Sequence, residues 1–218
     1  MRRERLVVKQ GHYRCRVPSP SCSLLMMTYP CANRWNEGGT PQRVLASEES
    51  QMDANRSPDG NSLAFGSMQV PHNPIYIIDL KSKRVSVLPG SFGFYSPHWS
   101  PDGRHMAAIR TEKPQTLYLF DFATQKWRQA FAGEIGYENW SHDGRYIYFE
   151  SYLAKLARFR IMRFRLSDGT TEELTNLDKT VGLTDSEYAN YWFGIAPDDS
   201  PFIFRSISTQ EIYALEVE

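Results

Sequence analysis

The sequence contains no run of about 18 consecutive apolar residues, the length that a helix needs to cross the hydrocarbon core of a bilayer. It also has no excess of either charge, because 25 Lys and Arg residues are balanced by 25 Asp and Glu residues. A neutral chain is a poor candidate for a nucleic-acid-binding surface, which is usually strongly basic. We therefore expect no membrane span and no direct binding of nucleic acid.

Cysteine is scarce, and all three cysteines, Cys15, Cys22 and Cys31, lie near the N-terminus. Their spacings match no zinc site, in which ligands come in pairs two to four residues apart. Their odd number implies no complete disulfide framework. We therefore predict free thiols in a reducing compartment.

Residues 1–39 carry seven basic residues against only two acidic ones, Glu4 and Glu37. Their only apolar run, Leu24–Met27, is too short for the core of a signal peptide. We expect this segment to be a basic extension, poorly ordered or a remnant, and the protein to be cytoplasmic. A periplasmic location is the alternative if the region belongs to a longer membrane-anchored protein.

Signatures of catalysis are also missing. No G-x-S-x-G nucleophile elbow and no Gly-rich phosphate loop is present. None of the five histidines stands three or four residues from another, which is a spacing common in metal sites. The sequence therefore predicts a protein that is not an enzyme, with no catalytic residue, no cofactor and no metal.

A four-residue string recurs at intervals of 43, 41 and 55 residues. Its copies are Ser57-Pro58-Asp59-Gly60, Ser100-Pro101-Asp102-Gly103, Ser141-His142-Asp143-Gly144 and the degenerate Ala196-Pro197-Asp198-Asp199. Pro presets the backbone of a type I turn, Asp suits the next position, and Gly accepts the left-handed conformation that follows. Each copy therefore predicts a structural turn between two antiparallel strands.

Strand-like segments rich in β-branched and aromatic residues follow each turn. A repeat of four antiparallel strands in about 40–45 residues is typical of a propeller blade. We predict an all-β fold over residues 40–218, a β-propeller of four four-stranded antiparallel blades. An additional strand at 42–46 would complete the last blade and close a four-bladed ring. The alternative is an arc of a larger six- to eight-bladed propeller.

The repeats resemble the WD-like propeller repeats of the TolB family, over about residues 38–218. The string Trp99–Arg104 and the strand Ile75–Leu80 carry this resemblance. The C-terminal part, 196–215, resembles the end of large bacterial proteins that join a winged-helix or serine/threonine kinase domain to such a propeller. The resemblance implies binding rather than catalysis, as the sensory or protein-interaction part of a bacterial regulatory protein.

The loops that enter the first strand of each blade, 90–95, 132–138 and 176–188, are the predicted binding face, because long loops often carry function. The binding candidates on this face are Tyr95, His98, Tyr137, Glu138 and Tyr188. The tryptophans near these loops, Trp99, Trp140 and Trp192, are expected to pack between blades instead, because aromatic side chains supply much of the buried area of a core.

Arginine alternates with other residues at Arg158, Arg160, Arg163 and Arg165. We interpret this segment as a strand that carries its arginines on one side and is interrupted by a bulge at Ile161-Met162. A solvated outer face is favoured over an anion or partner patch, since charges on outer strands discourage edge pairing.

Three hypotheses for function follow. The first is a non-catalytic propeller module that binds a protein partner or a small ligand. The second is a propeller accessory to an enzyme, either a prolyl-oligopeptidase-like hydrolase or a lyase. The third is a truncated remnant that completes its ring as a homodimer, whereas the first two are compatible with a monomer.

Overall fold

The computed structural model describes residues 31–32, 42–43, 51–67, 74–112, 114–153, 158–176 and 191–205. Every regular element in these ranges is a strand, and all strand pairs are antiparallel. The predicted all-β class is confirmed. Within the same ranges, no helix has the length and apolar character that crossing a bilayer requires.

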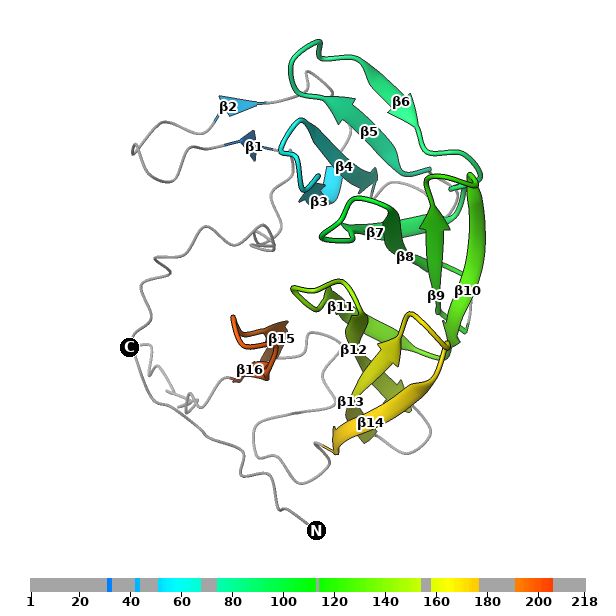
Figure 1. Cartoon of the computed structure of the whole chain (residues 1–218), viewed down its shortest axis with the longest axis vertical. Helices are drawn as coiled ribbons and strands as arrows, with labels where there is room; N and C mark the ends of the chain where they lie inside the picture. Colours follow the sequence, from blue (N-terminus) through cyan, green and yellow to red (C-terminus); the bar gives the residue numbers. More distant parts are fainter. Residues whose placement is uncertain are drawn as a thin grey trace, which may run out of the picture.

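Three consecutive four-stranded sheets form the body of the molecule, and each follows chain order from its innermost to its outermost strand (Figure 1). Blade 1 consists of β3 (Gln51–Arg56), β4 (Ser62–Ser67), β5 (Tyr76–Asp79) and β6 (Val85–Val87). Blade 2 consists of β7 (Phe94–Trp99), β8 (His105–Arg110), β9 (Thr116–Asp121) and β10 (Lys126–Ala132). Blade 3 consists of β11 (Ile135–Trp140), β12 (Tyr146–Leu153), β13 (Arg158–Arg165) and β14 (Thr171–Asn176).

Blade 4 is described as a pair of strands, β15 (Tyr191–Ile195) and β16 (Pro201–Arg205). The third strand expected at 212–217 lies outside the described residues. A separate two-stranded ladder joins β1 (Cys31–Ala32) to β2 (Gln42–Arg43). The described part of the strand predicted at 42–46 therefore pairs with the basic extension, and residues 44–46 lie outside the described ranges.

The repeated turns share one hydrogen-bond pattern. In blades 1 to 3 the glycine amide donates to the serine carbonyl at 2.9–3.0 Å, and the serine Oγ donates to the aspartate Oδ1 at 2.6–2.8 Å. The same Oδ1 accepts the amide two residues further on, at 2.9–3.0 Å. The three glycines have φ between 69° and 74°, a left-handed conformation that glycine adopts without steric cost. The motif residues thus occupy the turns, with Asp199 at the glycine position of blade 4.

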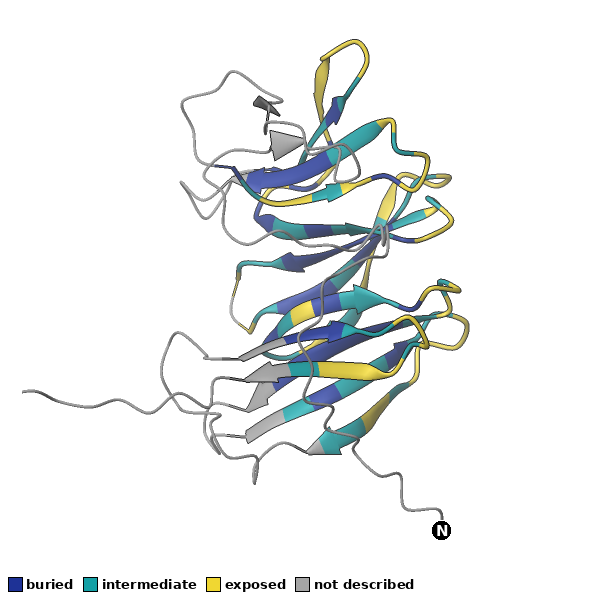
Figure 2. Cartoon of the chain, turned by 90° about the vertical axis from the view of Figure 1, so that its left-hand side faces the viewer, coloured by how far each residue is buried: buried dark blue, intermediate teal, exposed yellow. Residues whose placement is uncertain are grey.

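The hydrophobic core lies between successive blades, and Figure 2 shows the buried residues along the middle of the strands and the exposed ones in the turns. One cluster joins blades 1 and 2 and includes Ala64, Ile75 and Phe120. A second joins blades 2 and 3, and a third, around Phe193, joins blades 3 and 4. Each blade therefore buries its apolar face only by stacking on its neighbours, as repeat architectures require.

Trp99 and Trp140 pack against these clusters, as expected for aromatic side chains between blades. Trp140 Nε1 donates to the carbonyl of His98 in the preceding blade at 3.0 Å. The indole of Trp99 stacks on Phe122, with ring centroids 4.6 Å apart. The side chain of Trp192 lies outside the described residues.

The register shift predicted at Ile161-Met162 is present, but the additional residue belongs to β14 rather than to β13. Since β13 keeps a regular register with β12, its side chains alternate between the two faces of the sheet. Arg160 pairs with Glu173 on one face, and Arg163 pairs with Glu172 on the other. The prediction that the arginines share one side was therefore wrong.

Candidate functional site

The innermost strands of blades 1, 2 and 3 each carry a register shift at the same place in the repeat. Three residues at the shift have a left-handed backbone: Asp53 (φ 51°), Ser96 (φ 53°) and Tyr137 (φ 53°). Each stands four residues before the first position of its turn motif. This conformation is costly for any residue other than glycine, and such strain gathers at functional sites. Three copies of one strained bulge indicate a built feature of the inner strands.

Blade 4 differs in this respect, because β15 and β16 pair in a continuous register from Tyr191 to Ile195. The bulged geometry is thus confined, within the described ranges, to the inner strands β3, β7 and β11. Blades 1 to 3 consequently turn similar bulges toward the middle of the arc that the sheets form in Figure 1.

Glu138 follows the bulge residue of blade 3, and only 1% of it is exposed. Neither of its carboxylate oxygens has a hydrogen-bond partner of ordinary geometry within the described residues. Burial raises the pKa of Glu138 to about 8, although the neighbouring Ser96 hydroxyl acts in the opposite direction. The charge of Asp53 raises the pKa of Glu138 further.

Tyr95, the residue before the bulge in blade 2, lies within electrostatic range of these carboxyl groups. Its hydroxyl accepts a hydrogen bond from Gln115 Nε2 at 3.0 Å. Burial raises the pKa of Tyr95, and the charges of Glu138 and Asp53 raise it further. Both carboxyl groups therefore act on the same phenol, even though they belong to blades 3 and 1.

We call Asp53, Tyr95, Ser96 and Glu138 the inner-strand cluster. Its members come from three successive blades and combine two carboxyl groups with two hydroxyl groups. Asp53 is its most exposed member, and the surrounding protein still raises the pKa of this carboxyl. The cluster therefore concentrates hydrogen-bond acceptors in a partly desolvated place, where electrostatic interactions are strengthened.

Of the predicted binding residues, Tyr95 and Glu138 belong to the cluster. His98 lies at the far end of the blade 2 bulge, and burial lowers its pKa to about 4, so the ring is neutral at neutral pH. Tyr137 is 40% exposed. Its pKa is raised mainly by partial burial and to a lesser extent by the charge of Glu150. Tyr188 lies outside the described residues.

The location predicted for these side chains needs a correction. Tyr95 lies within β7, and Tyr137 and Glu138 lie within β11, rather than in the loops before those strands. The bulges, and not the loops, position them. Residues 177–188 of the third predicted loop lie outside the described ranges.

Asp53 and Ser96 are the two cluster members that the sequence did not reveal. The available signal is their position, four residues before the motif serine, which they share with Tyr137. No group of three or more His, Cys, Asp or Glu side chains that could hold a metal ion occurs in the described part of the chain. The cluster consists of two carboxyl groups and two hydroxyl groups, and all four can form hydrogen bonds.

Comparison with solved structures identifies the architecture. TolB from Acinetobacter baumannii superposes with a TM-score of 0.58 at 21% identity, over 75% of this chain and 39% of that one. A putative TolB from Agrobacterium tumefaciens gives a TM-score of 0.56 at 23% identity, over 73% and 56%. The fold is that of a TolB-like β-propeller.

The β-propeller domain of the Trilobed protease from Pyrococcus furiosus is also similar, with a TM-score of 0.54 at 17% identity, over 74% of this chain and 51% of that one. The chain thus spans between 39% and 56% of the length of these three structures. No protein-family model matches the sequence, and no curated protein matches it either. At these identities the similarity shows the propeller fold alone.

Proposed function

We propose that this TolB-like propeller is a non-catalytic binding module and that the inner-strand cluster contacts its partner. The observation that carries the proposal is Glu138, a buried carboxyl group whose oxygens have no hydrogen-bond partner of ordinary geometry in the described residues. Buried polar groups in proteins are nearly always satisfied, so an exception calls for a role. Binding to a partner supplies that role without any reaction.

The repeated bulges support the same proposal. Strained residues persist only where the surrounding structure holds them, and they cost about 1–3 kcal/mol each. A module used only as a spacer gains nothing from holding Asp53, Ser96 and Tyr137 in this conformation. The resemblance to bacterial fusion proteins gives the proposal a context, the sensory or protein-interaction part of a regulatory protein.

A random peptide display library selected on the full chain tests the proposal. We expect the selected binders to lose affinity for the Glu138→Gln and Tyr95→Phe variants. The matched control is Glu172→Gln, which alters an acid paired with Arg163 on the outer strands of blade 3. Binders that retain full affinity for the two cluster variants would overturn the assignment of the site.

Catalysis is the second candidate, and one observation favours it. A carboxyl group with a pKa of about 8 is suited to proton transfer near neutral pH. The propeller of the Trilobed protease also illustrates an association with an enzyme. Turnover of a peptide substrate by the chain, lost in Glu138→Gln, would favour this candidate over the binding module.

A further inference from the structure

The oxygens of the inner-strand cluster require a donor. Unpaired buried acceptors cost about 1–3 kcal/mol each, and more when they are charged. In its ionised form Glu138 contributes two oxygens that have no hydrogen-bond partner of ordinary geometry, although the Ser96 hydroxyl lowers its pKa, and Gln51, at the start of the same strand as Asp53, contributes a buried Oε1 that has no partner in the described residues. The inner strands of blades 1 and 3 thus present acceptors in excess.

The described residues supply no cation to these acceptors. Every ion pair of an Arg or His in the described ranges is made with another acid, such as Asp102, Asp143 or Glu172, and none with Asp53 or Glu138. Bringing a cation to the cluster would ionise Glu138 and pair it, which removes the cost of its burial. The missing component is therefore both a hydrogen-bond donor and a positive charge.

We propose that the inner-strand cluster binds the ammonium or guanidinium group of a lysine or arginine side chain on a partner polypeptide. This inference rests on the proposed binding function and specifies its ligand. An ammonium group has three N–H donors and a guanidinium group has five, and neither has an acceptor. Such groups complement two carboxylates and the hydroxyl oxygens of Ser96 and Tyr95.

The chemistry of the cluster favours an organic cation over a metal ion. Only two carboxyl groups meet here, whereas calcium takes six to eight oxygen ligands, including several carboxylates. The phenol ring of Tyr95 adds a face that can attract an ammonium or guanidinium group. Of the two sources of such a group, a free polyamine or a protein side chain, the peptide matches the proposed role of the module.

Binding of the cation should be coupled to release of a proton. Because the pKa of Glu138 is about 8 in the free protein, the carboxyl is mainly protonated at neutral pH and must ionise to pair with a cation. The affinity should therefore increase between about pH 6 and pH 9, while lysine and arginine remain charged. A surface attraction to ordinary acids would show no such increase, because their pKa values lie far below this window.

Fluorescence anisotropy with two labelled peptides of equal length tests the inference. One peptide carries lysine and arginine, one carries norleucine and citrulline in their place, and spermidine serves as the free polyamine competitor. We expect only the basic peptide to bind. We also expect Glu138→Gln and Asp53→Asn to weaken it by about tenfold or more, since a charge-assisted hydrogen bond contributes about 1.5–3 kcal/mol.

The control variant Glu172→Gln should change the affinity by less than about twofold, as for an exposed ion pair. Thermal unfolding checks that each variant is folded, and Asp53→Asn, at an exposed position, keeps the test valid if Glu138→Gln fails to fold. Equal losses in the control and cluster variants, or binding of the neutral peptide, would overturn the inference. Displacement of the labelled basic peptide by spermidine at a concentration well below that of unlabelled peptide needed for the same effect would overturn the assignment to a polypeptide.

The two proposals fail in distinguishable ways. Display-selected peptides that depend on Glu138 but need no lysine or arginine would leave the binding module in place and overturn its cationic ligand. Selected peptides whose affinity does not change when Glu138 or Asp53 is substituted would overturn both proposals.

Discussion

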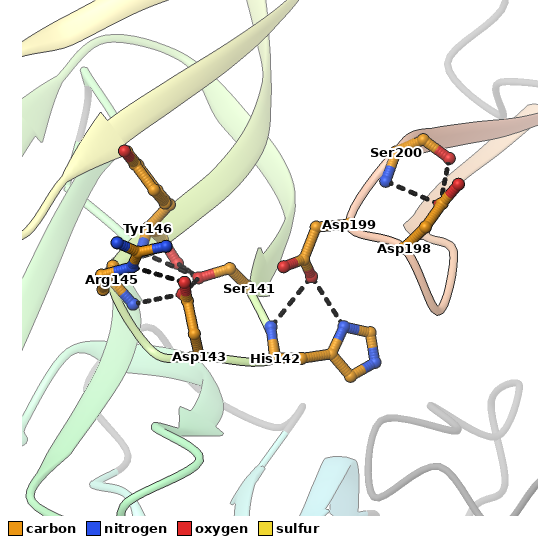
Figure 3. A network of polar contacts seen from close by, with 8 residues as sticks. All are labelled: Ser141, His142, Asp143, Arg145, Tyr146, Asp198, Asp199 and Ser200. Atoms are coloured by element: carbon orange, nitrogen blue, oxygen red, sulfur yellow. Dashed lines mark hydrogen bonds and ion pairs between the residues drawn. The ribbon is translucent and has the colours of Figure 1, made fainter.

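Asp199 of blade 4 accepts two hydrogen bonds from His142 of blade 3, one from the backbone amide at 2.9 Å and one involving ring Nδ1 at 2.6 Å (Figure 3). In the preceding blades the corresponding contact, between the second residue of one turn motif and the fourth residue of the next, is apolar. A Cβ built on Gly103 would lie 3.9 Å from Pro58, and one built on Gly144 would lie 3.5 Å from Pro101. The pair His142 and Asp199 therefore replaces a proline and a glycine together, and a polar contact takes the place of ring packing.

This replacement predicts that the two positions are energetically coupled. His142→Pro removes both donors to Asp199 and should lower the free energy of unfolding by about 1 kcal/mol. Asp199→Gly removes the acceptor but also relieves a left-handed backbone at φ 61°, so its loss should be smaller. The double variant restores the Pro–Gly contact of the other blades and should recover most of that loss. Urea unfolding of the four proteins measures the coupling. Simple addition of the two single effects would contradict it.

The Glu138→Gln variant should alter how stability depends on pH. The pKa of Glu138 in the native protein is about 8, against 4.5 in a free side chain, so the native state binds more protons between these values. The free energy of unfolding of the wild type should therefore fall as the pH rises from about 4.5 to 8, by a few kcal/mol from this group. Glutamine does not titrate, so the variant should lack this fall.

Chemical unfolding at a series of pH values measures both proteins. The difference in stability, variant minus wild type, should grow as the pH rises through the window and level off above about pH 8. A difference that is constant across the window would show that Glu138 keeps an ordinary pKa.

His98 should make the free energy of unfolding rise with pH on the acid side, opposite to the effect of Glu138. Burial lowers its pKa to about 4, against 6.5 in a free side chain, so the unfolded state binds more protons between these values. The neutral His98 ring makes its full contribution to the free energy of unfolding above about pH 6.5. This contribution is lost as the pH falls toward 4, and it amounts to about 1–2 kcal/mol for a half-buried ring. His98→Gln should flatten this part of the unfolding profile and leave the change above pH 6.5 that Glu138 causes. A variant as acid-sensitive as the wild type would contradict the assignment.

The sequence was sufficient to predict the architecture because the turn chemistry repeats. Pro, Asp and Gly each impose a local geometry, and that geometry recurs at one period, so strands and blades follow without knowledge of tertiary contacts. The bulges escaped prediction for the opposite reason. Their left-handed residues are Asp53, Ser96 and Tyr137, three unlike residues of which none is glycine, so no residue type marks the conformation.

The candidate site was predictable only in part. Tyr95 and Glu138 stand out because they precede the motif, but the burial of Glu138 depends on the packing of β11 against strands of other blades, which the motif does not encode. Likewise, the face of β13 on which each arginine lies depends on which strand holds the additional residue of the bulge. The pattern of arginines does not contain that information, because it belongs to the pairing with β14.

The turn serine of blade 2 gives a direct test of the motif. Ser100 is 1% exposed, and its Oγ donates to Asp102 Oδ1 at 2.6 Å while accepting the amide of His105 at 2.9 Å. Ser100→Ala leaves that amide without its acceptor, so the free energy of unfolding should fall by about 1–3 kcal/mol. Ser86→Ala is the matched control, because the hydroxyl of Ser86 is exposed and donates to Ile77 only at 3.4 Å.

Urea unfolding should show a change of less than about 0.5 kcal/mol for Ser86→Ala. Similar losses in the two variants would indicate that the turn hydroxyl contributes no more than an exposed one. In that case the recurrence of serine in three blades would reflect the turn backbone, which alanine can adopt at that position. A clear difference between the variants would instead assign the stabilisation to the paired serine and aspartate, which the sequence repeats in blades 1, 2 and 3.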